Sequence, residues 1–201
     1  MRRFLIGVCT TAIAAALAFV PAQAIFARDD EVPPVPAAVQ VDMTANKLFR
    51  VGHATGTQNY ICLPSGASFK YVLFTPQATL FEKNKQVMTH YFSPNPDQGG
   101  TVRATWQHDD TSTVWGEVKD GNASSDPAFV EPGAIAWLKV TVVGYEDGPK
   151  GGDKLAGTTF IQRLNTSGGL APATGCSSPA DVGKQQFVPY TADYFFYKAK
   201  H

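Results

Sequence analysis

Apolar and polar residues alternate along most of the chain from Thr57 onward. A period of two places successive side chains on opposite faces of a β-strand. The segments are also rich in Val, Thr, Ile, Tyr, Phe and Trp, the residue types that are enriched in strands. This pattern predicts strands at Thr57–Leu63, Phe69–Thr75, Thr79–Phe81, Gln86–Phe92, Thr101–Gln107, Thr113–Lys119, Ala136–Tyr145, Thr158–Asn165, Gln186–Tyr190 and Tyr194–Lys198.

Turn-forming residues separate these segments, and little in the sequence favours helix. Clusters of Gly, Pro, Asn and Asp lie between the predicted strands, as at Glu146–Gly152. One short helix is predicted after Cys176, with Ser178 as its N-cap and Pro179 in its first position. Short strands at this spacing are typical of an antiparallel β-sandwich or barrel. We therefore expect a single all-β domain over residues 51–201.

The N-terminus has the features of a secretory signal peptide over residues 1–24. Two arginines precede the apolar run Phe4–Val20, and an Ala-x-Ala cleavage site ends at Ala24. We expect cleavage after this site, a secreted or periplasmic mature protein, and no stable membrane insertion once the signal peptide is removed. Residues 25–50 are expected to form an extended, proline-rich leader and a lead-in to the domain.

The chain has 3 cysteines, and only Cys62 and Cys176 follow the signal peptide. In an oxidising compartment, two cysteines of a secreted domain most simply pair with each other. Zinc binding explains them less well, because two thiols fall short of four ligands and no C-x-x-C pair is present. The sequence therefore predicts a Cys62–Cys176 disulfide.

Charge is balanced, with 17 Lys and Arg against 17 Asp and Glu and a net charge of +0. Only 17% of the residues are charged. This composition gives no electrostatic basis for binding nucleic acid or an anionic membrane surface.

Several motifs occur in an order that matches a known family. They are Gly52-His53-Ala54, Gly56-Thr57-Gln58-Asn59-Tyr60, Cys62, Phe74-Thr75-Pro76-Gln77-Ala78-Thr79-Leu80-Phe81, Trp106, Trp115-Gly116, Ala134-Ile135, Trp137-Leu138, Thr159-Phe160-Ile161-Gln162-Arg163-Leu164-Asn165-Thr166, Ala171-Pro172-Ala173-Thr174-Gly175-Cys176, Val188-Pro189-Tyr190-Thr191-Ala192-Asp193-Tyr194 and Phe196-Tyr197. Together they resemble the secreted domain-of-unknown-function family 3455 of prokaryotes and fungi. The resemblance covers about His53 to Lys198 and implies no established activity. Some relatives carry a dehydrogenase label, which this sequence does not support, because it has no G-x-G-x-x-G motif and no βαβ alternation.

A group of polar residues forms the first candidate site. Gln162 and Arg163 lie among Phe160, Ile161 and Leu164 in a strand whose two faces are both mixed, so at least one of them should need polar partners in a partly buried place. The simplest interpretation of Arg163 is pairing with a carboxylate or with carbonyls at a sheet edge, and the alternative is a ligand-binding arginine. The candidate binding residues are His53, Gln58, Gln162, Arg163 and Asn165, together with Trp115.

Aromatic side chains are the second resource, because Tyr and Trp present a flat apolar face with a polar tip that can stack on sugars or aromatic ligands. Strand alternation places Trp115 opposite Val114, Gly116 and Val118, so we expect it on the less buried face of its strand. An unknown small molecule or a glycan is therefore the partner to consider.

The sequence leaves three functional interpretations open. The first is a binding or envelope-associated module, and the second is a hydrolase or metal-assisted enzyme that uses the polar cluster around His53 and Arg163. The third is a purely structural secreted protein. No cofactor or metal is predicted, because the chain has neither an H-E-x-x-H nor a G-x-S-x-G motif. Asp193 is interpreted as part of a turn between the last two predicted strands.

Overall fold

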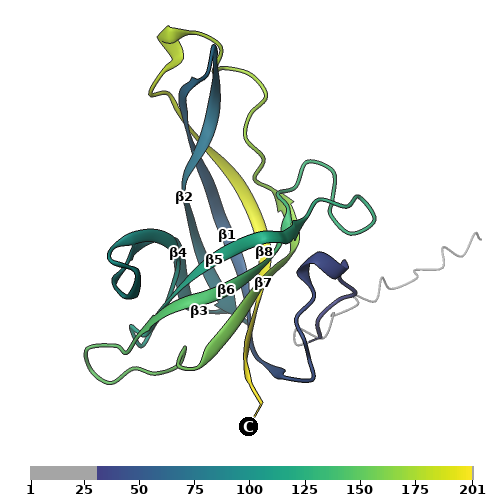
Figure 1. Cartoon of the computed structure of the whole chain (residues 1–201), viewed down its shortest axis with the longest axis vertical. Helices are drawn as coiled ribbons and strands as arrows, with labels where there is room; N and C mark the ends of the chain where they lie inside the picture. The colour runs from purple at the N-terminus through teal and green to yellow at the C-terminus, as the bar shows by residue number, and fades with distance from the viewer. Residues whose placement is uncertain (1–30, 201) are drawn as a thin grey trace, which may run out of the picture.

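The computed structural model describes residues 31–200, which form an antiparallel β-barrel (Figure 1). Each strand pairs with its neighbours in chain order, and β8 pairs with β1 to close the sheet. The strands are β1 (Asn46–Ser65), β2 (Ser68–Glu82), β3 (Lys85–Asn95), β4 (Thr101–His108), β5 (Thr113–Ser124), β6 (Trp137–Glu146), β7 (Thr158–Gly168) and β8 (Gln185–Ala199). The all-β prediction is confirmed. Of the two predicted architectures, a sandwich and a barrel, the structure has the barrel. The predicted signal peptide lies outside the described residues.

Helix is limited to three short 3-10 turns in the described part of the chain: η1 (Ala37–Val39), η2 (Pro96–Gln98) and η3 (Pro179–Asp181). The last of these is the predicted short helix, and Ser178 and Asp181 form a capping box at its start. The first two are not predicted by the sequence. None of the helices in residues 31–200 is long and apolar enough to cross a membrane.

β2 and β8 each run through a proline: Pro76 falls at a break between two predicted strands, whereas Pro189 falls within the predicted strand Gln186–Tyr190. Pro76 lies within β2, where pairing with β3 begins only at Ala78, so its missing N–H leaves no gap in that ladder. Pro189 lies within β8 directly before Tyr190, the first residue of β8 that pairs with β7. The predicted turn at Asp193 is wrong, because this residue pairs with strands on both of its sides.

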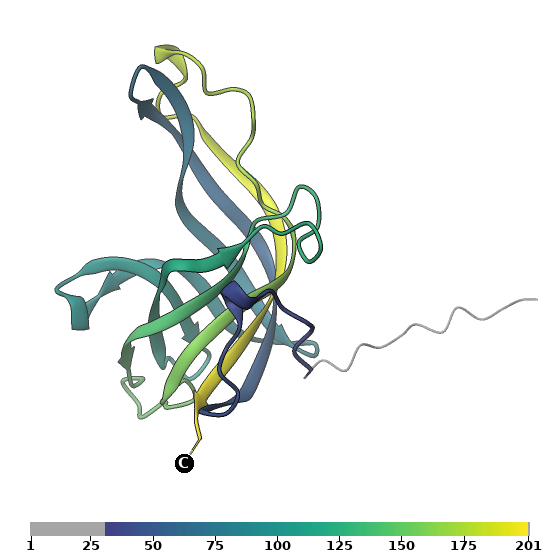
Figure 2. The same ribbon diagram turned by 45° about the vertical axis from the view of Figure 1, so that its right-hand side comes forward.

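Three strands extend beyond the barrel and form an arm (Figures 1 and 2). β1 has 20 residues, and β2 and β8 have 15 each. The segment between β7 and β8 runs along this arm, where Cys62 and Cys176 form the predicted disulfide with their Cα atoms 5.5 Å apart. Two backbone hydrogen bonds between Cys62 and residues 183 and 184 hold the same contact. We call the end of the barrel below the arm the open end.

The opposite end of the barrel is filled by side chains. Leu80, Met88, Val114, Leu155 and Phe196 are each at most 2% exposed and belong to the main hydrophobic cluster. Leu155 comes from the long connection between β6 and β7, which folds back over this end. We call this end the closed end.

A second hydrophobic cluster lies on the outside of the barrel, between β6 to β8 and the segment that precedes β1. Val39 is fully buried there, and its carbonyl accepts a hydrogen bond of 2.6 Å from Gln162 Nε2. The structure therefore differs from the lead-in expected over residues 25–50, since the chain before residue 51 already contributes core residues and the first five residues of β1. Apolar burial explains this, because an uncovered outer face of β7 and β8 would expose Leu164 and Phe195.

Removing the disulfide should destabilise the folded protein. Cys62 and Cys176 are 114 positions apart. For a loop of that length, the chain-entropy model gives a disulfide a contribution of about 4 to 5 kcal/mol to folding stability, which the variant loses. The Cys62→Ser/Cys176→Ser double variant should therefore unfold at a lower urea concentration than the oxidised protein, as measured by tryptophan fluorescence. Equal unfolding midpoints would show that the arm contributes nothing to stability through this bond.

Candidate functional site

The open end of the barrel contains a cavity of about 430 Å³. Residues of all eight strands line the cavity. Most of its walls are apolar: Leu73, Pro76, Phe92, Ala104, Val118, Ile135, Ala136, Leu138, Val140 and Leu170. Small-molecule sites in proteins have volumes of about 300 to 1,000 Å³. A barrel of eight strands is wide enough to hold one small ligand.

Three rings in contact, those of His90, Trp106 and Tyr194, form the floor of this cavity. His90 and Trp106 lie with ring centroids 4.3 Å apart and planes 12° apart, and Tyr194 meets the Trp106 ring edge-on at 5.6 Å. Below them, Phe196 packs edge-on against Trp106 at 6.5 Å and begins the core of the closed end. Gly116 makes room for this arrangement, because a Cβ atom there would lie 2.4 Å from Val140 Cγ1 and 3.3 Å from Trp106 Cζ3.

His90 is a neutral, fixed part of the floor. Its Nδ1 lies 2.8 Å from the carbonyl oxygen of Thr105, so Nδ1 carries the proton and Nε2 is left as an acceptor. Burial, assisted by the nearby positive charge of Arg163, lowers the pKa of His90 from 6.5 to about 3, against the opposing effect of the hydrogen bond to Thr105. At neutral pH the ring therefore adds no charge to the cavity.

Arg163 supplies the positive charge of the cavity wall. Its Nη2 and Nε donate to the carbonyl oxygen of Ala136 at 2.8 and 3.3 Å, which confirms the expected binding of a carbonyl. None of the ion pairs between described residues includes Arg163. Among the residues that line the cavity there is no Asp, Glu or Cys.

Two tyrosine hydroxyls lie near this charge. Tyr190 and Tyr194 have their hydroxyl oxygens 3.3 Å apart. Burial raises the pKa of both groups, and the positive charge of Arg163 opposes the rise without outweighing it. Both hydroxyls therefore stay protonated, so the pair retains an O–H that can donate.

Two further N–H groups of the cavity residues have no hydrogen-bond partner. Gln58 and Trp106 are 2% and 1% exposed, and Gln58 Nε2 and Trp106 Nε1 are buried without an acceptor. Leaving such a donor unpaired costs about 1 to 3 kcal/mol. The cavity therefore combines apolar walls, one cation and unused donors.

A separate polar contact lies on the outer surface of the barrel. His53 Nδ1 is 2.6 Å from Asp193 Oδ1, and Asn165 Nδ2 donates to Asp193 Oδ2 at 2.8 Å. Asn165 has a positive φ of 49° at the bulge between Leu164 and Ser167, which turns its side chain toward β8. These contacts join β1, β8 and β7 beside a shallow pocket that also includes Lys83.

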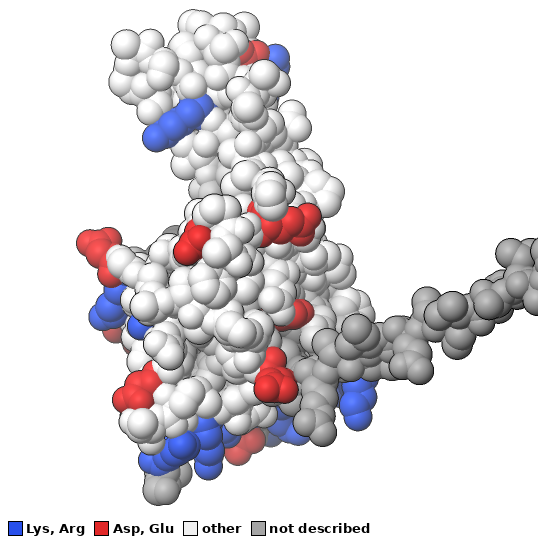
Figure 3. All heavy atoms as spheres, turned by 90° about the vertical axis from the view of Figure 1, so that its right-hand side faces the viewer, with Lys and Arg blue, Asp and Glu red and all other residues white. Residues whose placement is uncertain are grey.

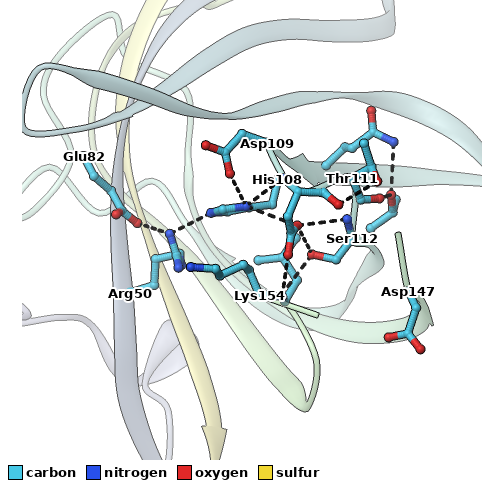
Figure 4. A network of polar contacts seen from close by, with 12 residues as sticks. Arg50, Glu82, His108, Asp109, Thr111, Ser112, Asp147 and Lys154 are labelled. Carbon is cyan, nitrogen blue, oxygen red and sulfur yellow. Dashed lines mark hydrogen bonds and ion pairs between the residues drawn. The ribbon is translucent and has the colours of Figure 1, made fainter. Parts of the chain in front are cut away.

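The closed end carries a larger ion network (Figure 4). Arg50 pairs with Glu82 and donates to His108 Nε2 at 3.0 Å, and His108 Nδ1 lies 2.7 Å from Asp109 Oδ1. Asp110 accepts hydrogen bonds from the Ser112 N–H and hydroxyl and from the Lys154 N–H at 2.7 to 3.0 Å. Burial opposes ionisation of Asp110, but these hydrogen bonds outweigh it and lower its pKa. The network ties β1, β2, β4 and the β6–β7 connection together.

The structure divides the candidate residues among four places. Gln58 and Arg163 share the cavity, whereas His53 and Asn165 meet on the outer surface. Gln162 faces outward under η1, because adjacent residues of a strand point to opposite faces. In the described part of the chain, no three His, Cys, Asp or Glu side chains gather as they would around a metal ion.

Trp115 does not lie where the sequence places it. It is only 5% exposed, and its Nε1 donates to Ser93 Oγ at 2.9 Å. It points out of the barrel, but the end of β3 covers it there. The expectation that Trp115 lies on a less buried face is therefore wrong.

Sequence analysis does not single out the floor of the cavity. His90 has apolar neighbours at alternate positions, Met88 and Phe92, and this pattern is the signal that a buried polar residue faces inward. Only the closed sheet shows that Trp106 and Tyr194 face the same interior.

The fold defines an up-and-down, antiparallel β-barrel with an internal cavity. A family model described as "Protein of unknown function (DUF3455)" matches residues 43–198, and the chain belongs to this family. The match spans the cavity residues from Gln58 to Tyr194. No curated protein and no solved structure matches the chain.

The depressed pKa of His90 predicts a pH dependence of stability. The unfolded chain binds a proton near pH 6.5 and the folded chain only near pH 3, so the His90 contribution to stability is lost as the pH falls through this interval. The His90→Gln variant can still donate to Thr105 and has no such proton. Its unfolding free energy should fall less steeply than that of the wild type below pH 6.5, by up to about 1.4 kcal/mol per pH unit. Parallel curves from urea titrations at several pH values would contradict this account of His90.

Proposed function

We propose that the protein is a secreted or periplasmic binding module that holds one small, mainly apolar molecule inside its barrel. The observation that carries the proposal is the cavity of about 430 Å³ above the His90, Trp106 and Tyr194 floor. The closed end of the same barrel is packed with large side chains, whereas Ala104 and Ala136 line the cavity. Burying apolar ligand surface against these walls supplies about 25 cal/mol per Å².

The rim of the cavity suits the entry of an apolar molecule. Val118 and Leu170 line it and are 42% and 50% exposed. On the face shown in Figure 3 the arm carries few charged side chains, and Lys and Arg gather toward the other end of the molecule. Tyr60 fixes one side of the rim, because its hydroxyl donates to the Gly169 carbonyl at 2.6 Å.

Several features favour binding over catalysis in this cavity. His90 is neutral, and one of its two ring nitrogens is engaged by Thr105. The enzyme alternative needs His53, Gln162 and Arg163 in one pocket, and they lie in three places. A glycan on Trp115 is disfavoured because that ring is buried. Secretion is supported by the signal-peptide features of the sequence, and a disulfide is typical of an oxidising compartment.

A neutral fluorescent probe tests the proposal. N-phenyl-1-naphthylamine should bind the purified protein saturably, with one site per chain and increased probe fluorescence. Ala104→Phe places a large ring in the cavity and should weaken this binding at least tenfold. Val102→Phe is the matched control, because Val102 lies on the same strand, is 59% exposed and does not line the cavity.

Two outcomes would overturn the proposal. One is the absence of saturable binding to the wild type. The other is equal affinity in the wild type and the Ala104→Phe variant, which would place the probe elsewhere on the surface. Thermal unfolding of both variants shows whether each one is folded before its affinity is compared.

A further inference from the structure

We infer that the molecule held in the barrel is an apolar carboxylic acid, whose carboxylate binds the donors of Arg163, Gln58 and Trp106. This inference rests on the proposed function and goes beyond it by naming the chemical class of the ligand. It begins from the two N–H groups that are buried without a partner, Gln58 Nε2 and Trp106 Nε1. Both residues line the cavity, so a ligand acceptor there would remove the cost of leaving them unpaired.

The polar groups of the cavity have nearest neighbours in common. Arg163 on β7 pairs with Tyr194 on β8, and the Trp106 ring meets the ring of Tyr194. The hydroxyl of Tyr194 lies 3.3 Å from that of Tyr190. Gln58 is close enough to Tyr190 to favour the ionised form of its hydroxyl, but the geometry of this contact leaves Gln58 Nε2 without a hydrogen bond. Tyr190 and Tyr194 are therefore the neighbours that the three donor residues share.

Charge selects an anion over a neutral acceptor. Arg163 is cationic at all physiological pH values, it is only partly exposed, and no described carboxylate pairs with it. A partly buried cation is stabilised by an anionic partner that it can hydrogen-bond. His90 is neutral and so adds no second positive charge. A singly charged carboxylate matches the single positive charge of Arg163. A phosphate monoester carries close to two negative charges, which is more than this site neutralises.

The shape of the donors also suits a carboxylate. A carboxylate is planar and has two oxygens that can accept several hydrogen bonds, and guanidinium, amide and indole N–H groups are all donors. A cationic ligand would meet the like charge of Arg163 without an acidic residue in the cavity lining to offset it. The apolar walls then contain the remainder of the acid.

The experiment compares ligands that differ only in the head group. Dodecanoate and 1-dodecanol share an alkyl chain, and 2-naphthoate and 2-naphthol share an aromatic ring system. Each is used at pH 7.5 to displace N-phenyl-1-naphthylamine from the full mature chain. At least one acid should displace the probe at a concentration ten times lower than its matched alcohol, and the pair that shows this preference identifies the apolar part.

Variants assign the preference to the proposed residues. Arg163→Met should abolish the tenfold preference, and Arg103→Met is the control, because Arg103 pairs with Glu117 on the outside of the barrel. Gln58→Met should reduce the preference at least threefold without lowering the melting temperature, because the native amide N–H is unpaired. Gln77→Met, at an exposed glutamine of β2, should have no effect.

The outcomes separate this inference from the proposed function. If the probe binds but acids and alcohols displace it equally, the carboxylate assignment is overturned and the binding function stands. The same conclusion follows if the acid preference survives in both Arg163→Met and Gln58→Met. If the probe does not bind at all, the proposed function itself fails.

Discussion

Hydrogen bonding between β1 and β8 closes the sheet, and this closure determines which side chains share the interior. The pairing brings residues from the two ends of the domain together, as with Gly52 and Tyr194. Once the sheet is closed, each strand contributes alternate side chains to one enclosed space. Closure also pairs both edges of each strand within the barrel, which removes the exposed sheet edges through which β-proteins aggregate.

The two ends of that space differ in how they are filled. At the closed end, the β6–β7 connection inserts Leu155, and an ion network around Arg50 and His108 fixes the surrounding strands (Figure 4). At the open end, small side chains and Gly116 leave room above the rings of His90 and Trp106. The disulfide-linked arm continues β1, β2 and β8 past this end, so the cavity lies next to a covalently cross-linked part of the chain.

The alternation of residue types is sufficient to predict the strands, the absence of long helices and the all-β class. It is not sufficient to predict which face is interior, because that depends on closure and on what covers the outside. Gln162 and Arg163 illustrate this. The alternation of side chains along a strand places them on opposite faces, but only the closed barrel and the contact of Gln162 with η1 show that Gln162 lies outside. Trp115 is buried by the end of β3, which is distant in sequence, and Asp193 is held in a strand by a register that no local pattern encodes.

We propose that the barrel interior binds a ligand beside Trp106. The chain has 3 tryptophans, which differ in environment: Trp115 Nε1 donates to Ser93, Trp137 Nε1 is unpaired within the outer cluster, and Trp106 Nε1 is unpaired on a residue that lines the cavity. The most direct test is a titration of the ¹⁵N-labelled protein with dodecanoate, followed through the indole N–H resonances. The Trp106 signal should move downfield as its N–H gains an acceptor, while the other two stay in place. A titration in which Trp106 is unmoved, or in which only Trp115 or Trp137 responds, would contradict the account.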